Sequence, residues 1–389
     1  MEKLQDKILE AEFAVPAAYL LFLLFAFLSF KIPVTRRYLI DSFSAPPSVE
    51  AYLLSLFGIA AFMLSVRIGK RMEVKAGSPL LLGVFVTTSA VVYLTLNIHI
   101  LLAILAGSGY AALLFFLSSQ QDFKKLTNLV FFLGLLSAFT ILIHGIPLLS
   151  ATAREAAAVS PSRALFHGFG VFAAALLVGF YDRKKAATAV LVLAIAGLLS
   201  GFKSDAIAII VSASIAGLLL KRITIRAAVA AVLAVGLILT GVSTFIALIA
   251  YGTWNIPPYL YPFYRFGFTF SVFSRIADLA LPFGLLKGQA ILNTTQEIVS
   301  TAVLGYHEPH IITSTLFGPL TLDFGILGTL LTAVLIGLYF GAMKRNTTLQ
   351  TCLYAMGLTH VLVLIEVGLQ LSSVMFLLSM LYLSISEKL

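Results

Sequence analysis

Long apolar runs, repeated along the whole chain and separated by short polar links, constrain the fold of this sequence more than any motif in it. A run of about 20 apolar residues is long enough to cross a bilayer core of roughly 30 Å as a helix. The runs are too long and too uniformly apolar for barrel strands, and a helix satisfies its own backbone hydrogen bonds in lipid. The sequence therefore predicts an all-α, polytopic transmembrane helix bundle. The roughly twelve expected helices cover about 13–30, 51–66, 79–95, 98–117, 126–144, 164–181, 186–200, 206–220, 227–250, 320–341, 349–366 and 371–385.

The composition agrees with a membrane protein and argues against other classes. Of the 389 residues, 60% are hydrophobic and 11% are charged, and the mean hydropathy is +1.02. The net charge is +9, but the basic residues stand in short clusters between apolar runs, so membrane topology explains them better than nucleic acid does. The one cysteine, Cys352, excludes an intramolecular disulfide and a cysteine metal cluster. The first run lacks a small-residue cleavage site, so we expect a retained helix.

The basic residues also predict the orientation. With twelve spans both termini lie on one side, and 17 of the 26 Lys and Arg fall on that side. By the positive-inside rule that side is cytoplasmic, in the plasma or inner membrane. Nine basic residues then face outward, either as solvated or snorkelling side chains or as anion-binding groups. They are Lys31, Arg36, Arg37, Arg154, Arg163, Lys203, Arg265, Arg275 and Lys287.

One interval, 251–319, is long without being simply apolar. We expect it to be a large extracytoplasmic loop within a single polytopic domain that covers 1–389. Its segment 268–286 has helical apolar spacing interrupted by Arg275 and Asp278, which suits a helix lying in the membrane interface. Function is therefore expected on the outer face.

Arginines and aromatic residues form the first candidate site in this loop. Arg265 follows a run rich in tyrosine and proline that includes Tyr264, and Arg275 comes ten residues later. Arginine presents a planar fork of donors that grips phosphate oxygens in pairs. Aromatic faces can stack on sugar rings, although anchoring at the membrane interface is their commoner use. With Arg163 and Lys203, these residues would suit a lipid-linked phosphate that carries a sugar.

Histidines and a carboxylate form the second candidate. His307, Glu308 and His310 lie close together, and an imidazole or a carboxylate there could take a proton from a hydroxyl. A solvated loop without function is the alternative. The spacing differs from the HExxH of zinc proteases, so we expect no metal.

Small residues mark the third candidate, Gly318 to Gly328, which contains Asp323. Helix packing explains the glycines, and the aspartate could bond either to backbone or to substrate. Lesser candidates are Lys203, which could simply pair with Asp205, and His360 with Glu366. The remaining histidines, His99, His144 and His167, are interpreted as lone packing or interface residues.

The pattern resembles the Wzy-type O-antigen polymerases, which polymerise oligosaccharide repeat units, and their relatives the O-antigen ligases. The resemblance rests on the helix number, the late outer loop, the outward basic residues and the segment TSTLFGPLTLDFGILG at 313–328. SGFKSD at 200–205 is similar to a short family turn in which arginine is more usual than Lys203. The ligase pattern of a histidine about eleven residues before Gly-x-x-Gly is only partly met, because His310 lies fifteen residues before Gly325.

The resemblance implies a GT-C-like membrane glycosyltransferase that joins polyprenyl-pyrophosphate-linked oligosaccharides on the outer face. Arg265 and Arg275, helped by Arg163 and Lys203, would neutralise the pyrophosphate leaving group, and His310 or Glu308 would deprotonate the acceptor hydroxyl. Tyr264, His307 and Asp323 would contact pyrophosphate or sugar. No cofactor and no metal are expected. The expected partners are the lipid-linked substrates, membrane lipids and a chain-length regulator protein, with no nucleic acid.

Other classes remain open. A lipid-oligosaccharide flippase would use a similar number of helices, but it should show repeat-related halves and charges deep in several helices. A ligase that transfers glycan to another acceptor is barely separated by sequence. An exosortase-like transpeptidase needs an outer-face cysteine, and Cys352 falls near the cytoplasmic end of an expected helix.

Overall fold

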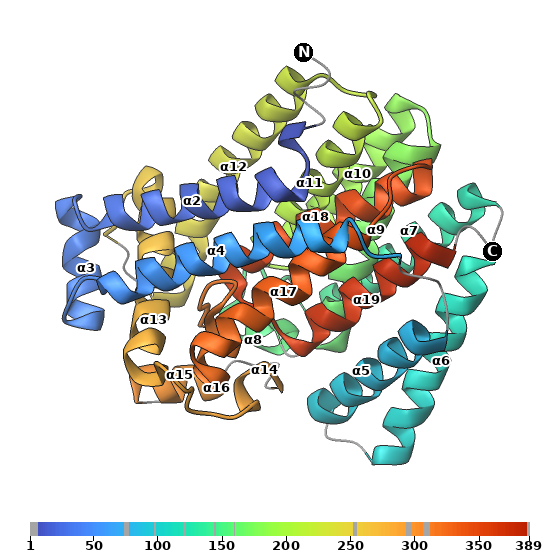
Figure 1. Cartoon of the computed structure of the whole chain (residues 1–389). Helices are drawn as coiled ribbons and strands as arrows, with labels where there is room; N and C mark the ends of the chain where they lie inside the picture. Colours follow the sequence, from blue (N-terminus) through green and yellow to red (C-terminus); the bar gives the residue numbers. More distant parts are fainter. Residues whose placement is uncertain are drawn as a thin grey trace. The chain divides into compact units, whose positions relative to one another are not determined.

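The computed structural model of the chain describes residues 7–73, 78–96, 99–119, 122–143, 145–158, 160–251, 255–292, 297–305 and 312–386. All regular elements in these residues are helical, which confirms the predicted all-α class (Figure 1). The helices in the first half are α2 (Ala11–Ser29), α3 (Pro33–Phe43), α4 (Val49–Gly69), α5 (Ser78–Leu96), α6 (Ile100–Ser118), α7 (Phe123–Leu142), α8 (Ala151–Ala158), α9 (Pro161–Phe180) and α10 (Arg183–Leu199). They are followed by α11 (Lys203–Leu219), α12 (Ile225–Tyr251), the 3-10 turn η1 (Pro258–Leu260), α13 (Tyr261–Ala280), α14 (Gln289–Leu292), α15 (Glu297–Leu304), α16 (Gly318–Phe324), α17 (Ile326–Ala342), α18 (Thr348–Val367) and α19 (Leu371–Ser386).

Eleven of the expected spans correspond to one helix each, with ends shifted by a few residues. The expected span 320–341 is wrong in one respect, because the chain breaks it into α16 and α17 at Gly325. Gly325 has φ +62°, and a Cβ there would lie 2.0 Å from the carbonyl oxygen of Pro282. A left-handed backbone at such close approach favours glycine and ends the helix.

Among the residues that the structure describes, seven helices are long and apolar enough to cross a membrane: α2, α4, α6, α7, α9, α12 and α18. Three more apolar helices are shorter, over Pro79–Leu94, Ile326–Ala342 and Leu371–Ser386. The expected interfacial helix begins earlier than predicted, at Tyr261, and ends at Ala280.

The described residues form two compact units. Unit 1 takes its residues from Met1–Leu9, Gln120–Tyr261 and Lys344–His360, and unit 2 from Glu10–Ser119, Pro262–Met343 and Val361–Leu389. A single polytopic domain over 1–389 therefore stays a prediction.

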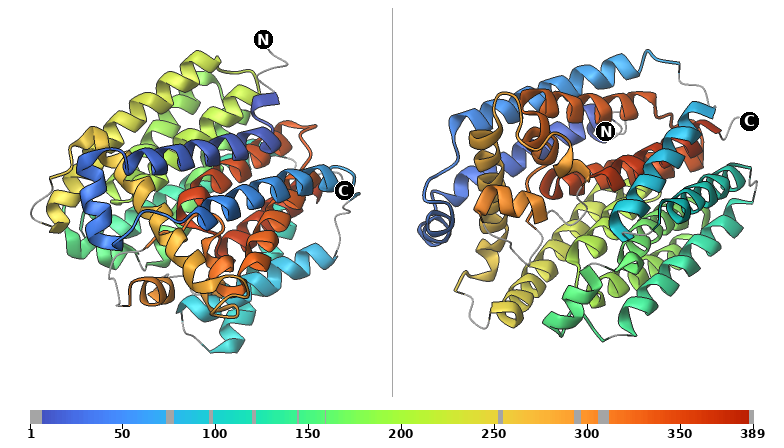
Figure 2. Two further views of the ribbon diagram at one scale, coloured as in Figure 1. Left: turned by 60° about the vertical axis from the view of Figure 1, so that its left-hand side comes forward. Right: turned by 90° about the horizontal axis from the view of Figure 1, so that it is seen from below.

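In unit 1, α9 is the central helix, with α7, α10 and α11 packed against it (Figure 2). Its face is built from alanine and glycine, and residues 171–177 are all buried. The small side chains let α18 come close: the Sγ of Cys352 donates to the Ala175 carbonyl at 3.2 Å, and a Cβ on Gly179 would lie 2.6 Å from that sulfur. Close approach over small residues is how membrane helices associate without a hydrophobic driving force.

In unit 2, α17 lies along α4 on a seam of small residues. Gly69 of α4 faces Gly341 of α17, and a Cβ on Gly341 would lie 2.5 Å from the Gly69 Cα. Helix α13 packs on α2 through aromatic rings, with Phe25 and Phe263 at 4.9 Å and Phe22 and Phe266 at 5.3 Å between centroids. This packing places the basic residues of α13 on a fixed helix of the unit.

Candidate functional site

Arg265, on the first turns of α13, lies in a hydrogen-bonded cluster of unit 2. Its Nε donates to Glu366 Oε1 at 2.5 Å, and its Nη2 donates to Thr313 Oγ1 at 3.0 Å. Thr313 also shares a 2.8 Å hydrogen bond with Thr269, one turn after Arg265 on the same helix. The Arg265 side chain is 26% exposed. These contacts orient the guanidinium while leaving part of it accessible.

Thr313 belongs to a stretch of buried, non-helical backbone. Residues 312–317 lie before α16, and all of them are buried. The Ser314 hydroxyl is buried and makes no hydrogen bond to any residue that the structure describes. Irregular backbone in a membrane protein is tolerated where protein buries it or where it lines a cavity, and it often marks a functional region.

The structure does not place Arg275 close to Arg265. The two lie ten residues apart on one straight helix, which is about 15 Å along its axis. The Arg275 side chain is exposed. Tyr264 packs within the unit, with its ring centroid 6.4 Å from that of Tyr38 and 6.0 Å from that of Phe268.

Asp323, at the end of α16, is fully buried and holds α14 and the loop before it. Its Oδ1 accepts from the Ala290 N–H and its Oδ2 from the Ile291 N–H, both at 2.9 Å. Its backbone carbonyl accepts from the Lys287 N–H at 3.2 Å. Of the two roles open from sequence, the contacts favour bonding to backbone, and contact of Asp323 with substrate stays a prediction.

We expect Asp323→Ala to destabilise the protein. The change would leave the Ala290 and Ile291 N–H groups without their acceptors, and each buried unsatisfied donor costs about 1–3 kcal/mol. Asp323→Asn keeps one accepting oxygen and should cost about half as much. Unfolding temperatures of purified wild type and variants in detergent would measure both. Equal unfolding temperatures for wild type and Asp323→Ala would show that the carboxylate does not hold this loop.

Unit 1 contains a second polar cluster, centred on Asp205 in the first turn of α11. Asp205 Oδ1 lies 2.9 Å from His167 Nδ1, and Oδ2 lies 3.9 Å from Arg163 Nε. The guanidinium of Arg163 sits 3.5 Å above the centroid of the Phe202 ring. The cluster combines cationic groups with an imidazole, and the Arg163 and His167 side chains are 24% and 23% exposed.

Lys203 does not pair with Asp205, contrary to the alternative weighed from sequence. Its Nζ donates to Ser243 Oγ at 2.7 Å and to Tyr261 Oη at 3.0 Å, and it lies 4.2 Å from the centroid of the Tyr261 ring. The structure therefore brings Arg163 and Lys203 to the same end of α9 and α11 but gives each a different neighbour.

The sequence interpretation missed His167, which was grouped with the packing histidines. Its position four residues after Arg163 on one helix puts both side chains on one face, and this was the available signal. The ring of His360 lies 5.9 Å from that of His167. The proposed bases Glu308 and His310, with His307 and with His144, lie outside the described residues.

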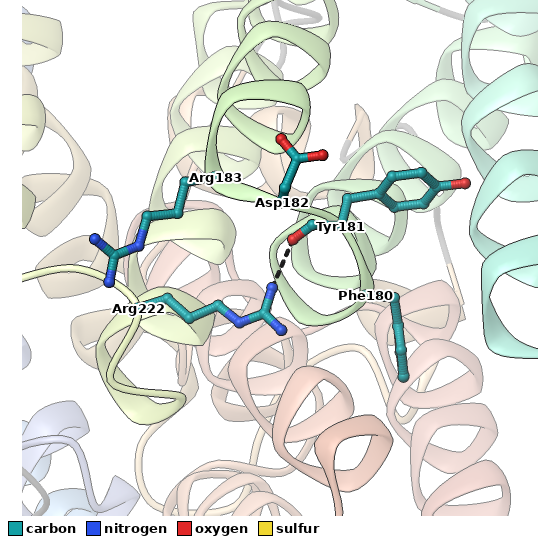
Figure 3. Close-up of a pocket in the computed structure, with 5 residues that line it drawn as sticks. All are labelled: Phe180, Tyr181, Asp182, Arg183 and Arg222. Atoms are coloured by element: carbon teal, nitrogen blue, oxygen red, sulfur yellow. Dashed lines mark hydrogen bonds between the residues drawn. The ribbon is translucent and has the colours of Figure 1, made fainter.

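A hollow in unit 1 lies at the other end of α9 and is not part of this cluster (Figure 3). Phe180, Tyr181, Asp182, Arg183 and Arg222 line it. Arg222 donates to the Val178 and Tyr181 carbonyls, both at 2.6 Å, and so caps the end of α9. The Lys185 N–H donates to Asp182 and lowers the pKa of its carboxyl. Arg222 and Asp182 are thus both used for helix capping.

The comparisons with known proteins agree with this architecture. The model of a family described as "Putative O-antigen polymerase" matches residues 13–378. No curated protein and no solved structure matches the chain. Among the described residues, no group of three His, Cys, Asp or Glu is arranged to hold a metal ion.

Proposed function

The chain belongs to the O-antigen polymerase family, and from that premise we propose that it polymerises polyprenyl-pyrophosphate-linked oligosaccharide repeat units on the outer face of the membrane. Family membership and the apolar helices make it a multi-pass membrane protein of polysaccharide biosynthesis. A polymerase of this family is a glycosyltransferase-type enzyme that acts on lipid-linked oligosaccharides.

One observation supports the mechanism most: Arg265 is oriented by Glu366 and by Thr313 of a buried irregular segment. In the proposed reaction a hydroxyl of one lipid-linked repeat unit attacks the anomeric carbon of another, and the polyprenyl diphosphate leaves. Negative charge then grows on the diphosphate, and a guanidinium held in place beforehand stabilises that charge without reorganising. Arg163 and Lys203 of unit 1 would bind the same class of group, as would Arg275 of unit 2.

Sugar contacts are proposed for Tyr264, His307 and Asp323, and proton removal for His310 or Glu308. Because cationic side chains would supply the positive charge, we propose that the reaction needs no metal ion, so a chelator should leave it unchanged. The charge distribution supports cytoplasmic termini in the plasma or inner membrane and an outward active site. A chain-length regulator protein is a proposed partner.

The test is incubation of the purified protein in lipid nanodiscs with lipid-linked repeat units. A polymerase gives a ladder of glycans that differ by one repeat unit and releases polyprenyl diphosphate. A flippase, the alternative function, moves the substrate between leaflets without joining it. A ligase gives one transfer product only when a second acceptor is supplied. The proposal fails if wild-type protein with intact substrate yields no ladder.

A further inference from the structure

His167 and Asp205 of unit 1 have the geometry of a catalytic dyad. The Nδ1 of His167 lies 2.9 Å from Asp205 Oδ1, so the carboxylate holds the ring at one nitrogen. The Asp205 side chain is only 2% exposed, whereas that of His167 is 23% exposed. A buried carboxylate behind a partly exposed imidazole is the arrangement by which other enzymes orient a general base.

The carboxylate also sets the tautomer. An ionised carboxylate can only accept hydrogen bonds, so the hydrogen of a neutral His167 must sit on Nδ1. Arg163 lies beside the same carboxylate, with its Nε 3.9 Å from Asp205 Oδ2. The Nε2 of His167 then carries the lone pair, and it makes no hydrogen bond to any residue that the structure describes.

Two basic residues lie at the same end of α9 and α11 as this imidazole. Arg163 lies one helical turn before His167, and Lys203 lies two residues before Asp205. A diphosphate held by Arg163 would place a sugar, and the hydroxyl attacking it, beside the imidazole. We propose that His167, in place of His310 or Glu308, is the catalytic base that accepts the acceptor proton, with Asp205 as its positioning residue; this inference rests on the proposed function.

The step balances without a further reactant. The acceptor O–H bond breaks and its proton moves to His167 Nε2, while the oxygen forms a bond to the anomeric carbon of the donor. The bond from that carbon to the phosphate oxygen breaks, and its electron pair leaves with the polyprenyl diphosphate. Asp205 stabilises the resulting imidazolium, which later releases its proton to water.

The experiment measures ladder formation by His167→Ala in nanodiscs. General-base catalysis is worth about 10²–10⁴-fold in rate, so we expect a loss of that size with nearly unchanged binding of the lipid-linked donor. Added imidazole should restore part of the rate, because it can occupy the vacated space and accept the proton. His99→Ala is the matched control, since His99 is an exposed helix cap in unit 2 and should leave the rate unchanged.

Two further variants separate catalysis from folding. His167→Gln keeps much of the side-chain volume and should lose the rate equally, but without rescue by imidazole. Asp205→Asn should lower kcat at least 10-fold and change KM for the donor little. A normal ladder from His167→Ala, or a loss accompanied by lost donor binding and no imidazole rescue, overturns the dyad. If either outcome occurs while the wild type still forms a ladder, the proposed function stands and only the dyad is excluded. If the wild type forms no ladder, the proposed function and the dyad are both excluded.

Discussion

Arg265→Ala is expected to abolish glycan chain extension while leaving membrane insertion intact. Removing one preorganised donor from a developing negative charge typically costs about 10²–10³-fold in rate. Arg265 contacts Glu366 and Thr313 with separate nitrogens, so a truncated side chain loses both the orientation and the charge. The ladder assay with purified protein and lipid-linked repeat units measures the loss.

Two other arginines of unit 2 sharpen this test. Arg37→Ala is the matched control, because Arg37 is exposed on α3 and is also expected to face outward. It should leave the glycan length distribution unchanged. The resemblance described from sequence gives Arg275 the same leaving-group role as Arg265. Since Arg275 is exposed and about 15 Å along α13 from Arg265, we now expect a smaller loss. A normal length distribution in Arg265→Ala would remove the leaving-group role.

Glu366→Gln would test the ion pair from the side of Glu366, the partner of Arg265. The neutral amide retains a hydrogen-bond acceptor but loses the charge that pairs with the guanidinium. Arg265→Lys would keep the charge but lose the planar fork whose separate nitrogens reach Glu366 and Thr313. This pairing joins residues 101 positions apart in the chain. Nothing in the sequence could predict it, although each residue was named alone as a candidate.

The helices were predictable because burial in lipid demands long apolar runs, and the runs are visible in the sequence. The short helices α3, α8, α14 and α15 were not predicted. They lie in the polar links between the apolar runs, where burial in lipid does not require a repeating pattern of apolar residues. The break at Gly325 was missed because its neighbours are as apolar as those of a continuous helix. Only the backbone angle of Gly325 and its contact with Pro282 reveal it.

The site was only partly predictable, for a geometric reason. The suggested pair of Lys203 and Asp205 joins residues two apart at the start of a helix, and such residues point to opposite sides. Asp205 therefore meets His167, 38 residues earlier, and Lys203 meets Ser243, 40 residues later. Charge pairing over such separations depends on which helices pack together, and apolar periodicity alone does not specify that order.

Gly328→Ala is expected to prevent folding or to destabilise the protein severely. After the break at Gly325, α17 starts against the end of α16, and a Cβ on Gly328 would lie 1.7 Å from the Leu320 carbonyl oxygen. The obstructing atom belongs to backbone and cannot rotate away, so the two helices would have to separate. Overpacking a closed contact costs about 1–3 kcal/mol, and more where backbone must move. The yield of monodisperse protein and its unfolding temperature measure the effect.

The same substitution at Gly109, Gly109→Ala, should have the opposite effect on stability. Gly109 lies within α6, where a Cβ would meet nothing within 4 Å. Alanine should therefore stabilise that helix by about 0.5–1 kcal/mol, through its higher helix propensity. If Gly328→Ala were as stable as Gly109→Ala, the close α16–α17 contact would not exist as described.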